Sequence, residues 1–144
     1  MSVKLLLFAT AAATMVAATP LAAQYGGRGL SANLTGRAEA PGPGKLNARG
    51  SANLTVNAGQ SRACYTVRYR NIANATMAHV HRGAVGVAGP PVITLRMAGP
   101  GRFQGCTRIA RPLARDLIRQ PGRFYVNVHS GAFPDGAIRG QLHR

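Results

Sequence analysis

The stretch RACYTVRYR, residues 62–70, decides the fold class of this chain. Its odd-numbered positions hold Ala, Tyr, Val and Tyr, whereas its even-numbered positions hold only Arg, Cys and Thr. A period of two gives a β-strand one dry face and one wet face. The stretch therefore predicts a half-buried strand, as found in antiparallel sheets with one face in water.

The same alternation continues on both sides of this stretch. Further strands are expected at residues 30–38, 46–56, 76–81, 92–97, 102–109, 123–130 and 138–143. Leu46 is expected on the dry face of the second of these. Pro112 suits a first helical turn, so one short helix is expected at residues 112–119, and PDG at 134–136 predicts a tight turn. The pattern predicts an all-β domain with one short helix, either an antiparallel sandwich or a Greek-key barrel.

The first 23 residues have the pattern of a cleaved signal peptide. Lys4 precedes an uncharged apolar run at residues 5–18, and small residues at 22 and 23 precede the expected cut. The run is short for a transmembrane helix, and no second apolar stretch approaches membrane length. We therefore expect a secreted or periplasmic mature chain, residues 24–144, that folds as a single domain without a transmembrane segment.

The chain is strongly basic. Lys and Arg total 18 and Asp and Glu total 3, which gives a formal net charge of +15. Such a charge predicts salt-dependent adhesion to polyanions, but the arginines are scattered, and a solvated, charged outer face is the favoured explanation for them. Tyr65, Tyr69 and Phe103 fall on dry faces, so no stacking platform for a specific nucleic acid is expected. An envelope or extracellular protein, or a polyanion, is the expected partner.

Two cysteines, Cys64 and Cys106, fall on the arginine-bearing faces of their expected strands. An even count in an exported chain favours a disulfide. The matching parity places this disulfide outside the core, as a staple between two strands.

Three motifs carry a resemblance to a known family: AHVHRG at 78–83, FYVNVHS at 124–130 and PDGAIRGQL at 134–142. Together they resemble the CHRD domain, first named in chordin and found as single copies in secreted bacterial proteins. The resemblance covers most of residues 24–144. It implies an immunoglobulin-like antiparallel β-sandwich outside the cytoplasm and says little about activity. The motif residues expected to have structural roles are Gly83, Asn127, Gly136, Arg139, Gly140 and Gln141. Arg139 is expected to bond to Asp135 or to loop carbonyls.

The histidines are the candidate ligands. His79 and His81 are two residues apart on one expected strand, so both side chains leave from the same face. His129 lies on the wet face of another strand. Imidazole suits copper and zinc, so these three side chains form a hypothetical metal site, with Met77 or His143 as an addition. The alternative is that each histidine makes only structural hydrogen bonds.

Catalytic patterns are weak. The three acids, Glu39, Asp116 and Asp135, fall in a loop, a helix and a turn, and His129 and Ser130 point to opposite faces. The sequence lacks the full ligand set of a superoxide-dismutase-like enzyme. The sequence therefore favours a secreted, non-catalytic binding module, with copper or zinc binding as the alternative function and a dismutase-like enzyme as a further one.

Overall fold

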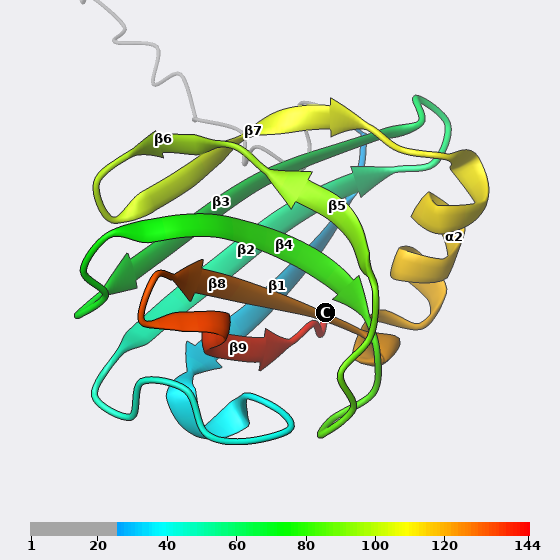
Figure 1. The fold of residues 1–144 in the computed structure, drawn as a ribbon. Coiled ribbons are helices and arrows are strands. Elements are labelled where there is room, and N and C mark those ends of the chain that lie inside the picture. Colours follow the sequence, from blue (N-terminus) through cyan, green and yellow to red (C-terminus); the bar gives the residue numbers. More distant parts are fainter. Residues whose placement is uncertain (1–25) are drawn as a thin grey trace, which may run out of the picture.

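The computed structural model describes residues 26–144, and its nine strands form one antiparallel sheet (Figure 1). The expected signal peptide, residues 1–23, lies outside the described residues. The strands in chain order are β1 (Arg28–Thr35), β2 (Arg49–Asn57), β3 (Arg62–Arg70), β4 (Ala75–Arg82), β5 (Pro91–Leu95), β6 (Met97–Gly99), β7 (Arg102–Arg108), β8 (Phe124–Ser130) and β9 (Phe133–Gln141). Their order in the sheet is β5-β4-β8-β9-β1-β2-β3-β7-β6.

The sheet curls into a nearly closed barrel (Figure 1). Its edge strands β5 and β6 are separated in sequence only by Arg96, so the chain passes directly from one edge to the other. At this crossing the Arg96 N–H donates to the hydroxyl of Tyr65 at 2.9 Å, and the Gln104 N–H donates to the Arg96 carbonyl at 3.0 Å. The all-β prediction is confirmed. A division into two immunoglobulin-like sheets is not confirmed, because the strands form a single sheet.

Alternating side chains from the strands fill the inside of this barrel. The strand at 62–70 behaves as its pattern predicts, with Ala63 and Val67 fully buried and Arg68 and Arg70 exposed. The expected helix is present as α2 (Arg111–Arg119), which lies across one end of the barrel (Figure 1). It contributes Ala114 and Leu117, both fully buried, to the core. Two 3₁₀ turns complete the fold, η1 (Gly36–Ala38) and η2 (Pro121–Arg123).

The predicted disulfide is confirmed. Cys64 and Cys106 are bonded to each other and are direct partners in the β3–β7 ladder. Their neighbours Ala63 and Tyr65 point into the core, so the disulfide lies on the outer side of the sheet. It joins two adjacent strands where the parity of the sequence placed it.

Two local expectations are wrong. Leu46 is 53% exposed, because the Ala48 N–H donates to the Lys45 carbonyl at 3.0 Å and closes a turn before β2 begins. The chain reverses at residues 131–132, and residues 134–136 lie inside β9 rather than in the turn. Between the pairs Ser130–Phe133 and Val128–Ile138 the strand β9 carries extra residues, which bulge out of the ladder.

Candidate metal centre

The structure brings His79, His81 and His129 together on the outer face of β4 and β8. These two strands are paired, with Met77 opposite His129 and His81 opposite Tyr125. One nitrogen atom from each histidine lies within 4.8 Å of those of the other two. His81 and His129 are buried and His79 is half-buried. The metal hypothesis required neighbouring strands in one sheet, and the ladder supplies them.

A loop covers this part of the barrel. Every residue of β8 is buried, so neither face of that strand is open to water. The loop at residues 83–90 is held by side chains from β9: Gln141 donates to the Gly83 carbonyl at 2.6 Å, and Arg139 donates to the Ala84 carbonyl at 2.7 Å. At its other end the Gly89 N–H donates to the hydroxyl of Tyr125 at 3.1 Å.

Backbone carbonyls fix the orientation of two of the imidazole rings. His81 donates from Nδ1 to the Gly89 carbonyl at 2.7 Å, and His129 donates from Nδ1 to the Pro134 carbonyl at 2.8 Å. The Nε2 atom of each ring therefore carries a lone pair and no hydrogen. The bulge in β9 explains the second bond, because it turns the Pro134 carbonyl back toward β8. Histidines that bind metals are oriented by bonds of this kind.

The third imidazole completes the cluster from its open side. His79 Nδ1 lies 3.1 Å from His129 Nε2, and since His129 Nε2 accepts, His79 Nδ1 carries the hydrogen. Nitrogen ligands at about 2.0–2.1 Å from a tetrahedral metal lie about 3.3 Å apart, so these two atoms already have a suitable separation. His81 Nε2 is buried and has no hydrogen-bond partner among the described residues. A cation bound here would take the place of the hydrogen on His79 Nδ1, so that His79 would adopt its other neutral tautomer with the hydrogen on Nε2, and the cation would also engage the lone pair of His81 Nε2.

Burial keeps the imidazoles of His79 and His81 uncharged. It lowers the pKa of His79 to about 4, and the neighbouring His129 and His81 rings act in the same direction. Burial also lowers the pKa of His81, against the bond to the Gly89 carbonyl and the nearby Asn127 side chain, which both raise it. Neutral imidazole is the form that binds metals. His79 and His81 are therefore uncharged at neutral pH, and each imidazole keeps one nitrogen without a hydrogen.

A buried cation lies beside the centre. The guanidinium carbon of Arg139, a residue only 2% exposed, lies 3.3 Å from the centroid of the Tyr125 ring. The same ring is stacked on His81, with centroids 4.8 Å apart and an interplanar angle of 10°. Neither Tyr125 nor the half-buried carboxyl of Glu39, which interacts with Arg139, was assigned to the site from the sequence. Only contacts between distant segments reveal them.

The remaining candidates fall at different distances from the cluster. Met77, directly opposite His129 in the ladder, is 50% exposed at the open side of the site. His143 is not brought to the centre: it bridges Ser31 of β1, and its Nδ1 atom bonds to the Arg144 carbonyl. Asn127, opposite His79, is buried, and its Oδ1 atom has no hydrogen-bond partner among the described residues.

The glycines of the family motif permit close approaches. A Cβ at Gly140 would run into the carbonyl of Asn33 on the adjacent strand β1. Gly136 has a φ of +147°, which favours glycine, and the Glu39 carboxyl packs against it. Gly83 supplies the carbonyl that accepts from Gln141. These positions hold the loops around the centre rather than contribute ligands to it.

Comparison with known proteins identifies the family. Within residues 26–144 no helix is both long enough and apolar enough to cross a membrane. No curated protein matches the chain. No solved structure matches it either. The family model described as CHRD domain matches residues 30–142, which include all three histidines and both cysteines. The chain belongs to the CHRD domain family.

Proposed function

We propose that this CHRD domain is a metal-binding module that holds one copper or zinc ion at His79, His81 and His129. The observation that carries the proposal is the orientation of His81 and His129. Both donate from Nδ1 to a backbone carbonyl, which leaves both Nε2 lone pairs free to meet His79 in one cluster. The binding atoms would be His81 Nε2, His129 Nε2 and one nitrogen of His79.

The alternative, purely structural histidines, accounts for only part of this arrangement. The Nδ1 bonds do fasten Gly89 and Pro134, as structural histidines would. Under the alternative, the buried His81 Nε2 has no hydrogen bond to any described residue, although the Asn127 side chain lies close enough to act on the pKa of His81. An unsatisfied buried polar atom costs about 1–3 kcal/mol, and a cation at this point would remove that cost.

The ligand set favours copper or zinc over harder cations. Three imidazoles suit both metals, and with nitrogen ligands Cu²⁺ generally binds more tightly than Zn²⁺. The site lacks carboxylate ligands of the kind that Mg²⁺ and Ca²⁺ require: Glu39, Asp116 and Asp135 are outside the three-histidine cluster. Met77 at the open side offers a thioether, a ligand type that suits reduced copper.

The wider role is proposed on the same basis. We place the protein outside the cytoplasm, in the periplasm or secreted, since a disulfide persists in oxidising compartments and the sequence begins with the pattern of a signal peptide. We propose that it binds without catalysis, because none of its three carboxylates joins the cluster to act as a general acid or base.

Metal titration of the purified protein tests the proposal. We expect about one equivalent of tightly bound copper or zinc, measured by metal analysis after dialysis and by calorimetric titration with each metal alone. His79→Ala is the chosen variant, because His79 fastens neither Gly89 nor Pro134. It should lose tight binding while its circular dichroism spectrum stays that of the wild type. His143→Ala, which removes an exposed imidazole outside the cluster, is the matched control and should bind as the wild type does. Equal weak binding by all three proteins would contradict the proposal.

A further inference from the structure

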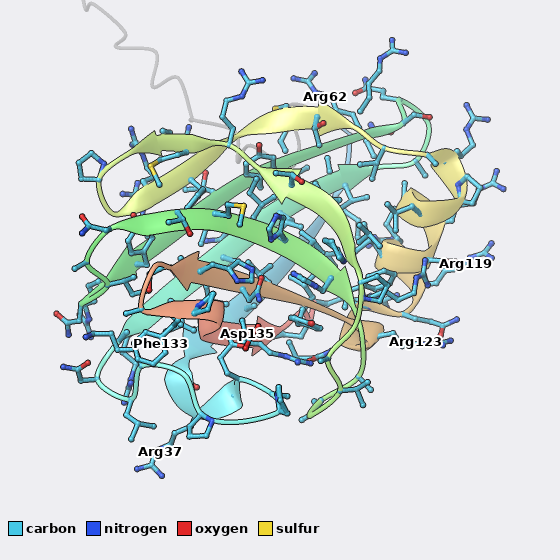
Figure 2. The ribbon with its side chains drawn as sticks, in the orientation of Figure 1. Arg37, Arg62, Arg119, Arg123, Phe133 and Asp135 are labelled. Atoms are coloured by element: carbon cyan, nitrogen blue, oxygen red, sulfur yellow. A yellow bond between two sulfur atoms is a disulfide. The ribbon has the colours of Figure 1, made fainter. Side chains whose placement is uncertain are left out.

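Arginines from three neighbouring strands gather on the outer side of the barrel. They form three cross-strand pairs, in which each arginine lies directly opposite another. The pairs, which together are named the arginine face, are Arg62–Arg108, Arg68–Arg102 and Arg49–Arg70. Figure 2 shows the labelled Arg62 pointing away from the barrel above β7, on the opposite side of the molecule from Arg37 and Asp135.

Stability of the sheet does not explain this pattern. Like charges that lie directly opposite each other in a β-ladder destabilise it. None of the three acids of the sequence lies on β2, β3 or β7, so these strands contain no carboxylate to offset the repulsion. Asp116 on α2 forms an ion pair with Arg82 on β4, outside these three strands, with an N–O distance of 2.9 Å. The strands β2, β3 and β7 therefore carry several arginines and no acidic residue.

The arrangement suits an extended ligand with repeated negative groups. The Arg62–Arg108 and Arg68–Arg102 pairs are six residues apart along β3, a distance of about 20 Å. Between them lie the disulfide and the neutral pair Thr66–Gln104. Next to the second pair, the Arg49–Arg70 pair borders an open hollow of about 290 Å³. Guanidinium groups bind carboxylate and sulfate groups through paired hydrogen bonds.

We propose that the arginine face binds an anionic polysaccharide, a partner beyond the metal proposed above. Neutral polar side chains between the arginine pairs can bond to sugar hydroxyls. Tyr65 and Phe103 are buried, and only the half-buried Tyr69 borders the hollow, so these strands offer no row of exposed rings on which successive nucleic-acid bases could stack. No large apolar side chain of the described chain is exposed on β2, β3 or β7, so the face has nothing to insert into a bilayer.

Binding to a charged dextran tests this inference on the purified protein. The probe is fluorescent dextran sulfate, compared with neutral dextran of the same length, in about 0.05–0.2 M NaCl. We expect dextran sulfate to bind with a strong salt dependence and neutral dextran not to bind. The double variant Arg68→Gln/Arg102→Gln should weaken binding about tenfold or more, which corresponds to the loss of one charge-assisted hydrogen bond. Its slope of log Kd against log salt should fall by about 1.4, as for two lost contacts with a flexible polyanion.

A variant that loses the same charge elsewhere distinguishes the effect of the arginine face on binding from the effect of net charge. Arg115→Gln/Arg119→Gln removes the same two charges from exposed positions of α2 and should bind dextran sulfate nearly as the wild type does. The Arg68→Gln/Arg102→Gln variant should unfold at the same urea concentration as the wild type or at a higher one, because it relieves a repulsion. Equal loss of binding in both variants would overturn the inference in favour of net charge alone. Tighter binding to phosphatidylglycerol vesicles or to single-stranded DNA than to dextran sulfate would overturn it in favour of another partner class.

Discussion

The carboxyl of Glu39 makes the stability of this domain depend on pH in a direction opposite to that of most acids. It follows η1, packs against Gly136, and its Oε1 atom is buried without a hydrogen-bond partner among the described residues. Burial raises the pKa of Glu39 from 4.5 to about 7, although the charge of Arg139 and the Ala40 amide act against this rise. The folded protein therefore binds a proton here more tightly than the unfolded chain does.

The sign of the pH effect follows from this difference. Below about pH 4.5 the carboxyl is protonated in both states, and the folded state has its full stability from this group. As pH rises from 4.5 through 7, the unfolded chain loses the proton first, so the free energy of unfolding falls. The difference of about 2.5 pKa units corresponds to about 3.4 kcal/mol at most. Because Glu39 is only half-buried, screening by solvent reduces the expected loss to about 1–2 kcal/mol.

The substitution Glu39→Gln tests this reasoning, because glutamine resembles the neutral acid at every pH. In the metal-free protein, urea unfolding should give nearly equal stabilities for variant and wild type near pH 4.5. At pH 8 the variant should be more stable by about 1–2 kcal/mol. Subtracting the two curves removes every other titrating group that they share. Asp135→Asn, at an exposed position close to Gly136, controls for the loss of one negative charge from this region.

If the free energies of unfolding of Glu39→Gln and wild type differed by the same amount at every pH from 4.5 to 8, the raised pKa of a buried Glu39 would be refuted. A variant that is less stable than wild type at pH 8 would refute it more strongly. In that case the ionised Glu39 would stabilise the fold through Arg139 by more than its burial costs.

Three further perturbations have expected magnitudes. Replacing Cys64 and Cys106 together by serine should lower the free energy of unfolding by about 4 kcal/mol, since the disulfide closes a 42-residue separation; an unchanged urea midpoint would contradict this. Gly140→Ala should cost about 1–3 kcal/mol in thermal unfolding, because its methyl group would meet a backbone carbonyl of β1, and a wild-type melting temperature would disprove that packing. Leu117→Ala should cost about 2–5 kcal/mol and the exposed Leu46→Ala less than about 0.5 kcal/mol; equal urea-unfolding losses would contradict the assigned core.

Properties that depend on neighbouring residues were predictable from the sequence. The period of two placed Cys64 and Cys106 on the outer side of their strands, and the structure joins them there. The same parity placed His79 and His81 on one face of their strand and His129 on the wet face of another, and the structure brings all three onto one face of the sheet. The alternation of side chains between the two faces is a local property of an extended chain, so it can be predicted without knowing which strands pair.

Properties that depend on contacts between distant segments were not predictable. The single curled sheet arises because the chain crosses from β5 to β6 at Arg96, and nothing in that residue signals the crossing. The bulge that turns the Pro134 carbonyl toward His129 was interpreted as a tight turn, since proline, aspartate and glycine suit both. The exposure of Leu46 follows from a backbone bond between residues 45 and 48, which an apolar pattern does not encode.

His81 joins the candidate metal centre to the loop that covers it. Its Nδ1 atom holds the Gly89 carbonyl at one end of the loop, and its Nε2 atom points into the histidine cluster. Tyr125 reinforces this link, because it stacks on the His81 ring and bonds to Gly89 through its hydroxyl. A cation on Nε2 would fix the ring that positions the loop, and the closed loop in turn keeps the ring turned toward the cation. Any effect that a cation on Nε2 had on the hold of this loop would therefore be matched by an equal effect of the loop on the affinity for the cation.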